Sequence, residues 1–255
     1  MPEILIILQI TGMAYSFFVL CSLICQDFQI LSRVCYTAPI LNMLVNSMSN
    51  ILVFDASSSW CSVALSIHGK LYYAAQLQPR KHAQLIMPMI DDLCRQADIK
   101  PKQLDGIAFG KGPGSFTGLR IAISVAQGLS LATGAKLFGI SSLQALAWQG
   151  MKVKNAESIV AIMNAHMGEV FYSAYRKTDQ GPVAVVEDAL AKPENVDYSQ
   201  LLNRSDLTSL TWLGAGDGFQ FKADMPQVMS FVDTVDEDIS SMAESMMDLA
   251  LSAWD

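Results

Sequence analysis

The sequence has few of the residues from which metal sites and disulfide frameworks are built. Its 255 residues include five cysteines and three histidines, with no CxxC pair and no HxxxH or HExxH motif. An odd number of scattered cysteines favours a reduced, cytoplasmic protein over a disulfide-stapled one. Because the available ligands lack usable spacing, we expect no metal site.

Clusters of basic residues are also missing. The chain carries 17 Lys and Arg against 24 Asp and Glu, which gives a formal net charge of -7. A protein that binds nucleic acid without a partner neutralises the phosphates with clustered Lys and Arg side chains. The composition therefore predicts that any contact with RNA passes through a partner.

The first 47 residues differ from the rest. Ile4 to Cys25 is an apolar stretch long enough for one membrane crossing, and Gln9 is its only strongly polar residue. Arg33 is the only Lys or Arg before Met48, so the charge signal that orients a membrane segment is weak. Two interpretations of residues 1–47 stay open: they form a signal anchor, or the protein starts at Met48. The second is favoured, because a buried-strand pattern follows Met48 at once.

An apolar run, a polar turn and a second strand occur twice in the chain. Ile51–Phe54 precedes the strand Cys61–Ile67, and Ile159–Met163 precedes the strand Val170–Tyr175. Such a unit buries its apolar face only when helices cover the sheet. The repeat predicts an α/β protein with two similar lobes built on mixed sheets. The expected division is a doubtful segment 1–47, an N-terminal lobe 48–150 and a C-terminal lobe 151–255.

Two helices are expected between the copies, over Lys81–Ala97 and Thr117–Thr133. The first has an apolar stripe wider than one core face needs, and the second repeats small residues every four positions, which lets another helix approach closely. A second small-residue row contains Ser124, Gly128 and Ala132. Either the first row packs on its own sheet, or row and stripe form a contact surface for a partner, which the wide stripe favours. The residues expected in that surface are Leu85, Ile86, Met89, Leu93, Gly118, Ala122, Ala126 and Ser130.

The second helix follows a glycine-rich loop, "KGPGS", that opens at the end of an expected strand, Asp105–Gly110. Such a loop can bind phosphate, because the first amides of a helix are unpaired. The spacing fits neither GxxxxGK[ST] nor GxGxxG, since Gly112 follows Lys111 and Ser115 stands where the third glycine belongs. The alternative is a tight turn in which Ser115 or Thr117 caps the helix.

The segments "ILVFDASSSWCSVAL", "RKHAQLIMPMIDDLCRQADI", "GPGSFTGLR" and "NAHMGEVFYSAY" resemble the bacterial TsaB family, also called YeaZ, of tRNA threonylcarbamoyladenosine biosynthesis proteins. The resemblance runs from Met48 to about Phe219. It implies an actin-like ATPase fold of the sugar kinase/Hsp70/actin (ASKHA) class. It also implies a non-catalytic subunit of the complex that places threonylcarbamoyl on N6 of adenosine 37 in tRNAs reading ANN codons.

The resemblance further implies the partners. The two helices would bind the catalytic paralogue TsaD, the ATPase TsaE would join the complex, and tRNA would be reached only through it. The free protein would form a homodimer through the same helices. No cofactor would be required, and ATP or ADP would bind only weakly at the interface within the complex.

Several residues depart from the catalytic pattern of the fold. The paralogue holds a metal with HxxxH, whereas here Ile86 follows His82 at the fourth position. Actin-like kinases use a DxG turn in each lobe, and here the two turns read Asp55-Ala56-Ser57 and Asn164-Ala165-His166. We therefore expect no catalytic residue. The vestigial nucleotide cleft is expected at Asp55, Ser57, Gly112, Gly114 and Asn164.

Two rival functions are less favoured. One is an ATP-dependent phosphotransferase that uses Asp55 and the Gly112 loop, and the other is a peptidase, for which no nucleophile and base are evident. The chain also stops at "MMDLALSAWD", whereas family members end in a Pro-x-Tyr-Leu-Arg segment and a short Val-Ala-Trp stretch. This difference predicts that the terminal strand is missing or replaced, either because the open reading frame is truncated or because the lineage has diverged, and both would weaken the second lobe.

Overall fold

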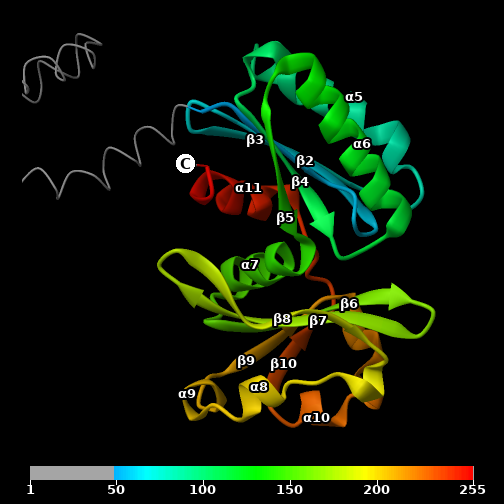
Figure 1. Ribbon diagram of the computed structural model, residues 1–255, viewed down its shortest axis with the longest axis vertical. Helices are drawn as coiled ribbons and strands as arrows, with labels where there is room; N and C mark the ends of the chain where they lie inside the picture. Colours follow the sequence, from blue (N-terminus) through cyan, green and yellow to red (C-terminus); the bar gives the residue numbers. More distant parts are fainter. Residues whose placement is uncertain (1–48, 255) are drawn as a thin grey trace, which may run out of the picture. The chain divides into compact units, whose positions relative to one another are not determined.

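The computed structural model of the protein describes residues 49–254. The expectations for residues 1–47 lie outside the described residues. Within 49–254, no helix is both long and apolar enough to cross a membrane. The described chain forms two lobes, each built on a five-stranded mixed sheet (Figure 1).

The first lobe has strand order β3-β2-β1-β4-β5. β1 pairs antiparallel with β2 and parallel with β4, while β3 and β5 lie at the two edges. The unbroken apolar run at β1 is buried on both faces, as expected for a central strand covered by helices on each side. The elements are β1 (Ile51–Asp55), β2 (Trp60–Ile67), β3 (Lys70–Leu77), α5 (His82–Gln96), β4 (Gly106–Gly112), α6 (Phe116–Thr133), β5 (Lys136–Ser141) and α7 (Ser142–Lys154).

The second lobe repeats this topology. Its order is β8-β7-β6-β9-β10, and β6 pairs antiparallel with β7 and parallel with β9. The duplication and the two similar lobes on mixed sheets predicted from the sequence are thereby confirmed. The elements are β6 (Ser158–His166), β7 (Glu169–Thr178), β8 (Gly181–Ala191), α8 (Ser199–Leu202), α9 (Ser205–Thr208), β9 (Trp212–Ala215), a 3-10 segment (Asp217–Asp224), α10 (Pro226–Met229), β10 (Val232–Asp236) and α11 (Ala243–Ser252).

The last helix of each half packs on the sheet of the other half. α7 follows β5 of the first sheet but contacts β6 and β7, and α11 follows β10 but contacts β1 and β2. Both helices lie between the two sheets (Figure 1). The Asp248 carboxylate joins them, because it accepts hydrogen bonds from the Trp148 indole at 3.0 Å and the Lys152 ammonium at 2.7 Å. The expected boundary at residue 150 stays a prediction, although the range 151–255 includes a helix that packs on the first sheet.

α5 and α6 cover the outer face of the first sheet. The apolar side chains Ile86, Met89, Ile90 and Leu93 of α5 face the sheet and enter the same core as Leu52 and Phe54 of β1. These helices are the ones expected from the sequence, with α5 and α6 each within one residue of the expected ends.

Candidate functional site

The residues expected in the partner surface are mostly part of the core. Gly118, Ala122 and Ala126 of α6 are buried, as are Ile86, Met89 and Leu93 of α5. Leu85 and Ser130 are half-buried, and the Ser130 hydroxyl donates a hydrogen bond to the Ala135 carbonyl at 2.8 Å. The assignment of these buried residues to a partner surface is therefore wrong. The alternative, that the first small-residue row packs on its own sheet, is correct.

The physical reason is the close approach of α6 to the turn between β1 and β2. A Cβ atom on Gly118 would overlap the carbonyl oxygen of Ala56. The Ser115 amide donates a hydrogen bond of 2.7 Å to the Ser57 carbonyl, which ties the start of α6 to this turn. The small side chains of the first row are needed for this approach, so a long charged residue at Ala126 would disrupt the core and would not test an interface.

The second small-residue row of α6 faces outward. Ser124, Gly128 and Ala132 are exposed, and a Cβ atom on Gly128 would meet no atom within 4 Å. Leu131 stands beside this row with 91% of its surface exposed. We call the exposed residues Ser124, Gln127, Gly128, Leu131 and Ala132 the outer face of α6.

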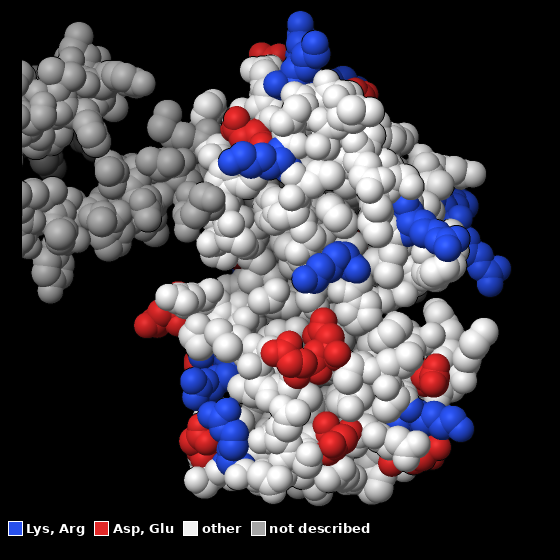
Figure 2. All heavy atoms as spheres, in the orientation of Figure 1, with Lys and Arg blue, Asp and Glu red and all other residues white. Residues whose placement is uncertain are grey.

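The outer face of α6 is uncharged. From Ile121 to Thr133 the helix has no acidic or basic side chain, and Figure 2 shows the uncharged surface over this helix. At the start of the helix Phe116 is 68% exposed, and the Arg120 guanidinium lies 3.9 Å from the centre of its ring. A helix that exposes small and apolar side chains without charges is typical of a surface that another protein covers. The sequence contained both rows, but nothing in their spacing said which one faced the sheet.

A cleft of about 520 Å³ lies between the lobes and includes two of the expected nucleotide-cleft residues. Ser57 and Asn164 line it, whereas Asp55, Gly112 and Gly114 do not. The expected cluster is thus only partly brought together. Other lining residues of this cleft include Arg80, His82, Ser115, Thr117, His166 and Asp217.

Asp55 is sequestered from this cleft. Its carboxylate is buried and accepts hydrogen bonds from the Ser57 amide at 3.0 Å and the Ser57 hydroxyl at 2.9 Å. Burial raises the pKa of Asp55, and the two bonds from Ser57 act in the opposite direction. The serine that replaces the glycine of a DxG turn therefore occupies both carboxylate oxygens from within the chain.

The glycine loop also bonds within the chain. Gly112 has φ +98° and Gly114 φ +157°, which favour glycine, and a Cβ atom on Gly114 would overlap the Ser57 carbonyl oxygen. The Ser115 amide already donates to that carbonyl, and the Ser115 hydroxyl accepts from the Gly118 amide at 3.3 Å. Of the two expected capping residues, Ser115 is the cap. The loop supports the turn after β1.

In the second lobe, Asn164 is also held by its own chain. Its amide donates to the Asp217 carboxylate at 2.9 Å, and its side-chain oxygen accepts from the His166 amide at 2.8 Å. The side-chain oxygen that would replace the carboxylate of a DxG turn therefore stabilises the turn between β6 and β7.

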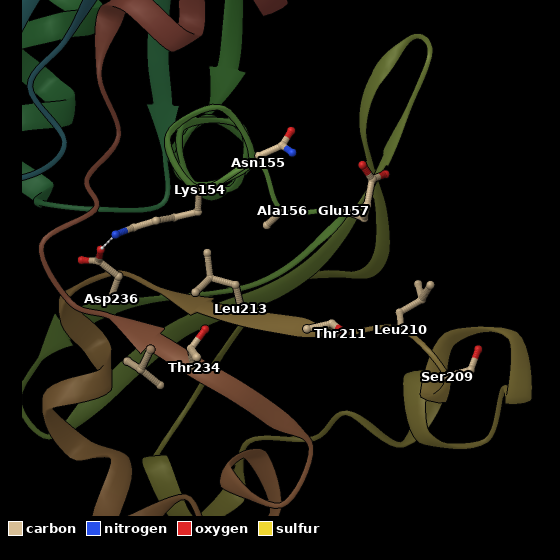
Figure 3. Close-up of a pocket in the computed structure, with 11 residues that line it drawn as sticks. Lys154, Asn155, Ala156, Glu157, Ser209, Leu210, Thr211, Leu213, Thr234 and Asp236 are labelled. Atoms are coloured by element: carbon tan, nitrogen blue, oxygen red, sulfur yellow. Dashed lines mark ion pairs between the residues drawn. The ribbon is translucent and has the colours of Figure 1, made fainter.

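A larger hollow of about 790 Å³ opens on the second lobe, below the end of α7 (Figure 3). An ion pair of 2.7 Å between Lys154 and Asp236 crosses one side, and the hydrogen bond from Lys154 lowers the pKa of Asp236. The lining also includes the apolar side chains of Leu210 and Leu213, the hydroxyl of Thr211 and the carboxylate of Glu157 (Figure 3). Lys154 is thus paired with Asp236 within the lining, and Glu157 is a second carboxylate there.

Comparison with known proteins gives a consistent result. The family model described as TsaD, tRNA N6-adenosine threonylcarbamoyltransferase, matches residues 76–251. The tRNA threonylcarbamoyladenosine biosynthesis protein TsaB of Escherichia coli (strain K12) is 33% identical over 201 residues, which cover 78% of this chain and 85% of that protein. TsaB of Haemophilus influenzae is 39% identical over 123 residues, 48% of this chain and 52% of that protein. The solved structure of YeaZ from Pseudomonas aeruginosa has a TM-score of 0.75 and 35% identity, covering 81% of this chain and 92% of that one.

Proposed function

The chain belongs to the TsaB family of tRNA threonylcarbamoyladenosine biosynthesis proteins, and from this premise we propose that it is a non-catalytic subunit that binds and activates the catalytic subunit TsaD. The family assigns it to the biosynthesis of threonylcarbamoyladenosine in tRNA. The proposal concerns how it takes part. The chain presents a helix to TsaD, the ATPase TsaE joins the pair, and tRNA contacts the assembly rather than this subunit alone.

The observation that carries the proposal is the outer face of α6. Its small-residue row lets a helix of a partner approach the backbone of α6 closely, because no side chain stands on Gly128. Leu131 is exposed beside this row and supplies apolar contact area. An uncharged helix face of this kind is costly to leave in water on an otherwise acidic protein, which favours a protein partner.

The state of the inter-lobe cleft supports the non-catalytic part of the proposal. Productive phosphate chemistry needs a carboxylate that is free to orient magnesium. Asp55 is bound from both sides by Ser57, and the amide of Ser115 is bonded to the Ser57 carbonyl. The proposal accordingly includes no required cofactor, and only weak ATP or ADP binding where the cleft meets TsaD. It also places the protein in the cytoplasm, as a homodimer when TsaD is absent.

The test compares two apolar residues that are exposed on different helices. Leu131→Glu changes the outer face of α6, and Val153→Glu, at a residue 59% exposed on α7, is the matched control. Both variants should keep the thermal stability of the parent. Leu131→Glu should weaken binding to purified TsaD by about a hundredfold, because it buries a charge in the contact, and Val153→Glu should leave it unchanged. Equal binding by both variants, measured by titration calorimetry, would reject this face as the contact surface.

The activation itself needs a second measurement. Threonylcarbamoyl transfer to tRNA by TsaD with TsaE should fall with Leu131→Glu and recover when the variant is added at a concentration that restores binding. If transfer stays low although the complex has formed, the contact is right and the activating role must be assigned to another part of the chain.

A further inference from the structure

The net charge of -7 hides an uneven division of charge between the two halves of the protein. Residues 49–154, through the end of α7, contain eleven Lys and Arg against five Asp and Glu, whereas residues 155–254 contain five against sixteen. Figure 2 shows Lys and Arg side chains on the first lobe beside the start of α6, and Asp and Glu side chains over the second lobe. The first lobe is therefore the part of the described chain that attracts an anionic partner.

Three of these cations lie where α5 and α6 begin. Arg80 and Lys81 directly precede α5, and Arg120 is in the second turn of α6. All three side chains are exposed. Arg80 lines the same cleft as Thr117 and Gly118 of α6, so the two helices begin close together. We call Arg80, Lys81 and Arg120 the basic rim.

The positive charge of the basic rim is not neutralised within the described residues. The ion pairs found there join other side chains. Between Asp55, which is buried, and Asp91 the sequence has no acidic residue, and after Asp105 the next one is Glu157. The rim therefore keeps its charge available to a partner.

The arrangement of the basic rim favours an extended polyanion over a small anion bound in the cleft. Of the three cations only Arg80 lines the cleft, together with the carboxylate of Asp217, while Lys81 and Arg120 lie outside the lining. The Arg120 guanidinium lies 3.9 Å from the centre of the Phe116 ring, and Phe116 is 68% exposed. Exposed aromatic rings among cations are typical of surfaces that bind nucleic acid.

We propose that the basic rim contacts the phosphate backbone of tRNA while the assembly with TsaD holds the tRNA. This inference rests on the proposed function, in which tRNA is the substrate of the assembly. Leu131 is eleven residues beyond Arg120, roughly 16 Å along α6, so TsaD can cover the Leu131 end while the rim stays open. Three phosphate contacts are too few to hold tRNA against repulsion from the acidic second lobe, so the subunit alone would bind tRNA weakly.

The salt dependence of tRNA binding tests the proposal, because each phosphate contact releases counterions. The full chain is assembled with TsaD, and binding of a labelled tRNA that reads ANN codons is followed by fluorescence anisotropy at several salt concentrations. Replacing Arg80, Lys81 and Arg120 together with Gln should weaken binding by about tenfold or more at low salt. It should also lower the slope of log affinity against log salt by about two to three. Arg80→Lys combined with Arg120→Lys keeps both charges and should keep the parental slope.

A matched control removes the same net charge from the second lobe. It replaces Arg176, Lys177 and Lys192 with Gln, and its salt slope should equal that of the parent. Circular dichroism confirms that each variant is folded. Binding of TsaD is measured first, without tRNA, so that failure of the proposed function and failure of this inference are separate results.

Three outcomes would overturn the proposal. A rim variant that binds TsaD as the parent does, and keeps the parental salt slope, would show that the rim does not contact tRNA. A folded rim variant that no longer binds TsaD would assign the rim to the protein contact. An equal fall in slope for the rim variant and the second-lobe control would show a general effect of net charge.

Discussion

The two glycines of α6 predict opposite effects of the same substitution. Gly128→Ala adds a methyl group that meets no atom within 4 Å, whereas Gly118→Ala adds one that overlaps the Ala56 carbonyl oxygen. Gly128 lies in the interior of the helix and Gly118 in its first turn, so the gain in helix propensity is largest at Gly128 and the overlap at Gly118 adds to the difference. The pair therefore tests which face of α6 is turned toward the sheet.

The magnitudes follow from the two environments. Alanine is favoured over glycine by about 1 kcal/mol in an exposed helix interior, so Gly128→Ala should raise the melting temperature by roughly 2–4 °C. At Gly118 any gain in helix propensity is opposed by the overlap with main-chain atoms, which cannot move away by changing rotamer as a side chain can. Overpacking of this kind costs about 1–3 kcal/mol or more, so Gly118→Ala should lower the melting temperature.

Urea unfolding of both variants, followed by circular dichroism, gives the two free energies directly. A longer side chain separates stability from binding: Gly128→Gln should be at least as stable as the parent, yet keep a partner helix away from α6 and weaken the proposed complex with TsaD. A destabilised Gly128→Ala would show that this position is buried, which would refute the orientation of α6. A stable Gly128→Gln variant that binds TsaD normally would leave the orientation intact and refute the outer face of α6 as the contact.

Three further predictions concern groups inside the fold. Burial raises the pKa of Asp55 above 3.8, so above that pH the folded state binds more protons than the unfolded state. The free energy of unfolding should therefore fall as pH rises from about 4 through the folded pKa. Urea titrations of Asp55→Asn should lack this part of the pH dependence. A Cβ atom on Gly106 would overlap the Trp254 ring and would lie 2.9 Å from the end of the Ile51 side chain. Gly106→Ala should therefore be less destabilising in a Trp254→Ala background than in the parent, and additive effects in this double-mutant cycle would contradict the contact with Trp254. Asp248→Ala leaves the Trp148 indole N–H without its acceptor and should lower the free energy of unfolding by about 1–2 kcal/mol. Lys152→Ala breaks only a half-exposed ion pair and should lower it by under about 1 kcal/mol. The reverse order in thermal unfolding would contradict this assignment.

The sequence predicted the strands and long helices well where one physical signal dominates. The apolar runs of β1 and β6 are central strands covered on both faces, and the stripe on α5 contains enough apolar residues to define its buried side. α6 is different because small residues occupy two adjacent rows. Hydrophobicity cannot choose between Ala122 and Ser124, since either row suits a close contact. The choice depends on the Ser115 amide bonded to Ser57, a contact between segments 58 residues apart.

The crossing of α7 and α11 to the opposite sheets was also not predicted, although α7 carried a signal. Its buried residues Leu143, Leu146, Ala147 and Met151 are accompanied by Ser142, Ala145 and Gly150 on other sides of the helix. A helix buried on several sides lies between two layers. The connections β5–α7 and β10–α11 decide which two sheets enclose each helix. The strand pattern in the sequence shows the repeat, but it does not show that each helix packs on the sheet of the other half.

The contacts of Ser57 support the proposed role as a binding subunit. Its hydroxyl and amide hold Asp55, and its carbonyl holds the first turn of α6. These bonds use the groups that a phosphate site would leave free, and they fix α6 against the sheet without a ligand. A rigid α6 presents its outer face in one orientation, which lowers the entropy lost on binding. Replacing Ser57 with Gly removes only the hydroxyl bond to Asp55, because the amide and carbonyl bonds are made by the backbone. The lost bond and the added backbone freedom of glycine in this turn should loosen the start of α6 and weaken TsaD binding while leaving Leu131 and Gly128 unchanged. A Ser57→Gly variant with parental hydrogen-exchange protection at Gly118 would show that the network does not position the helix.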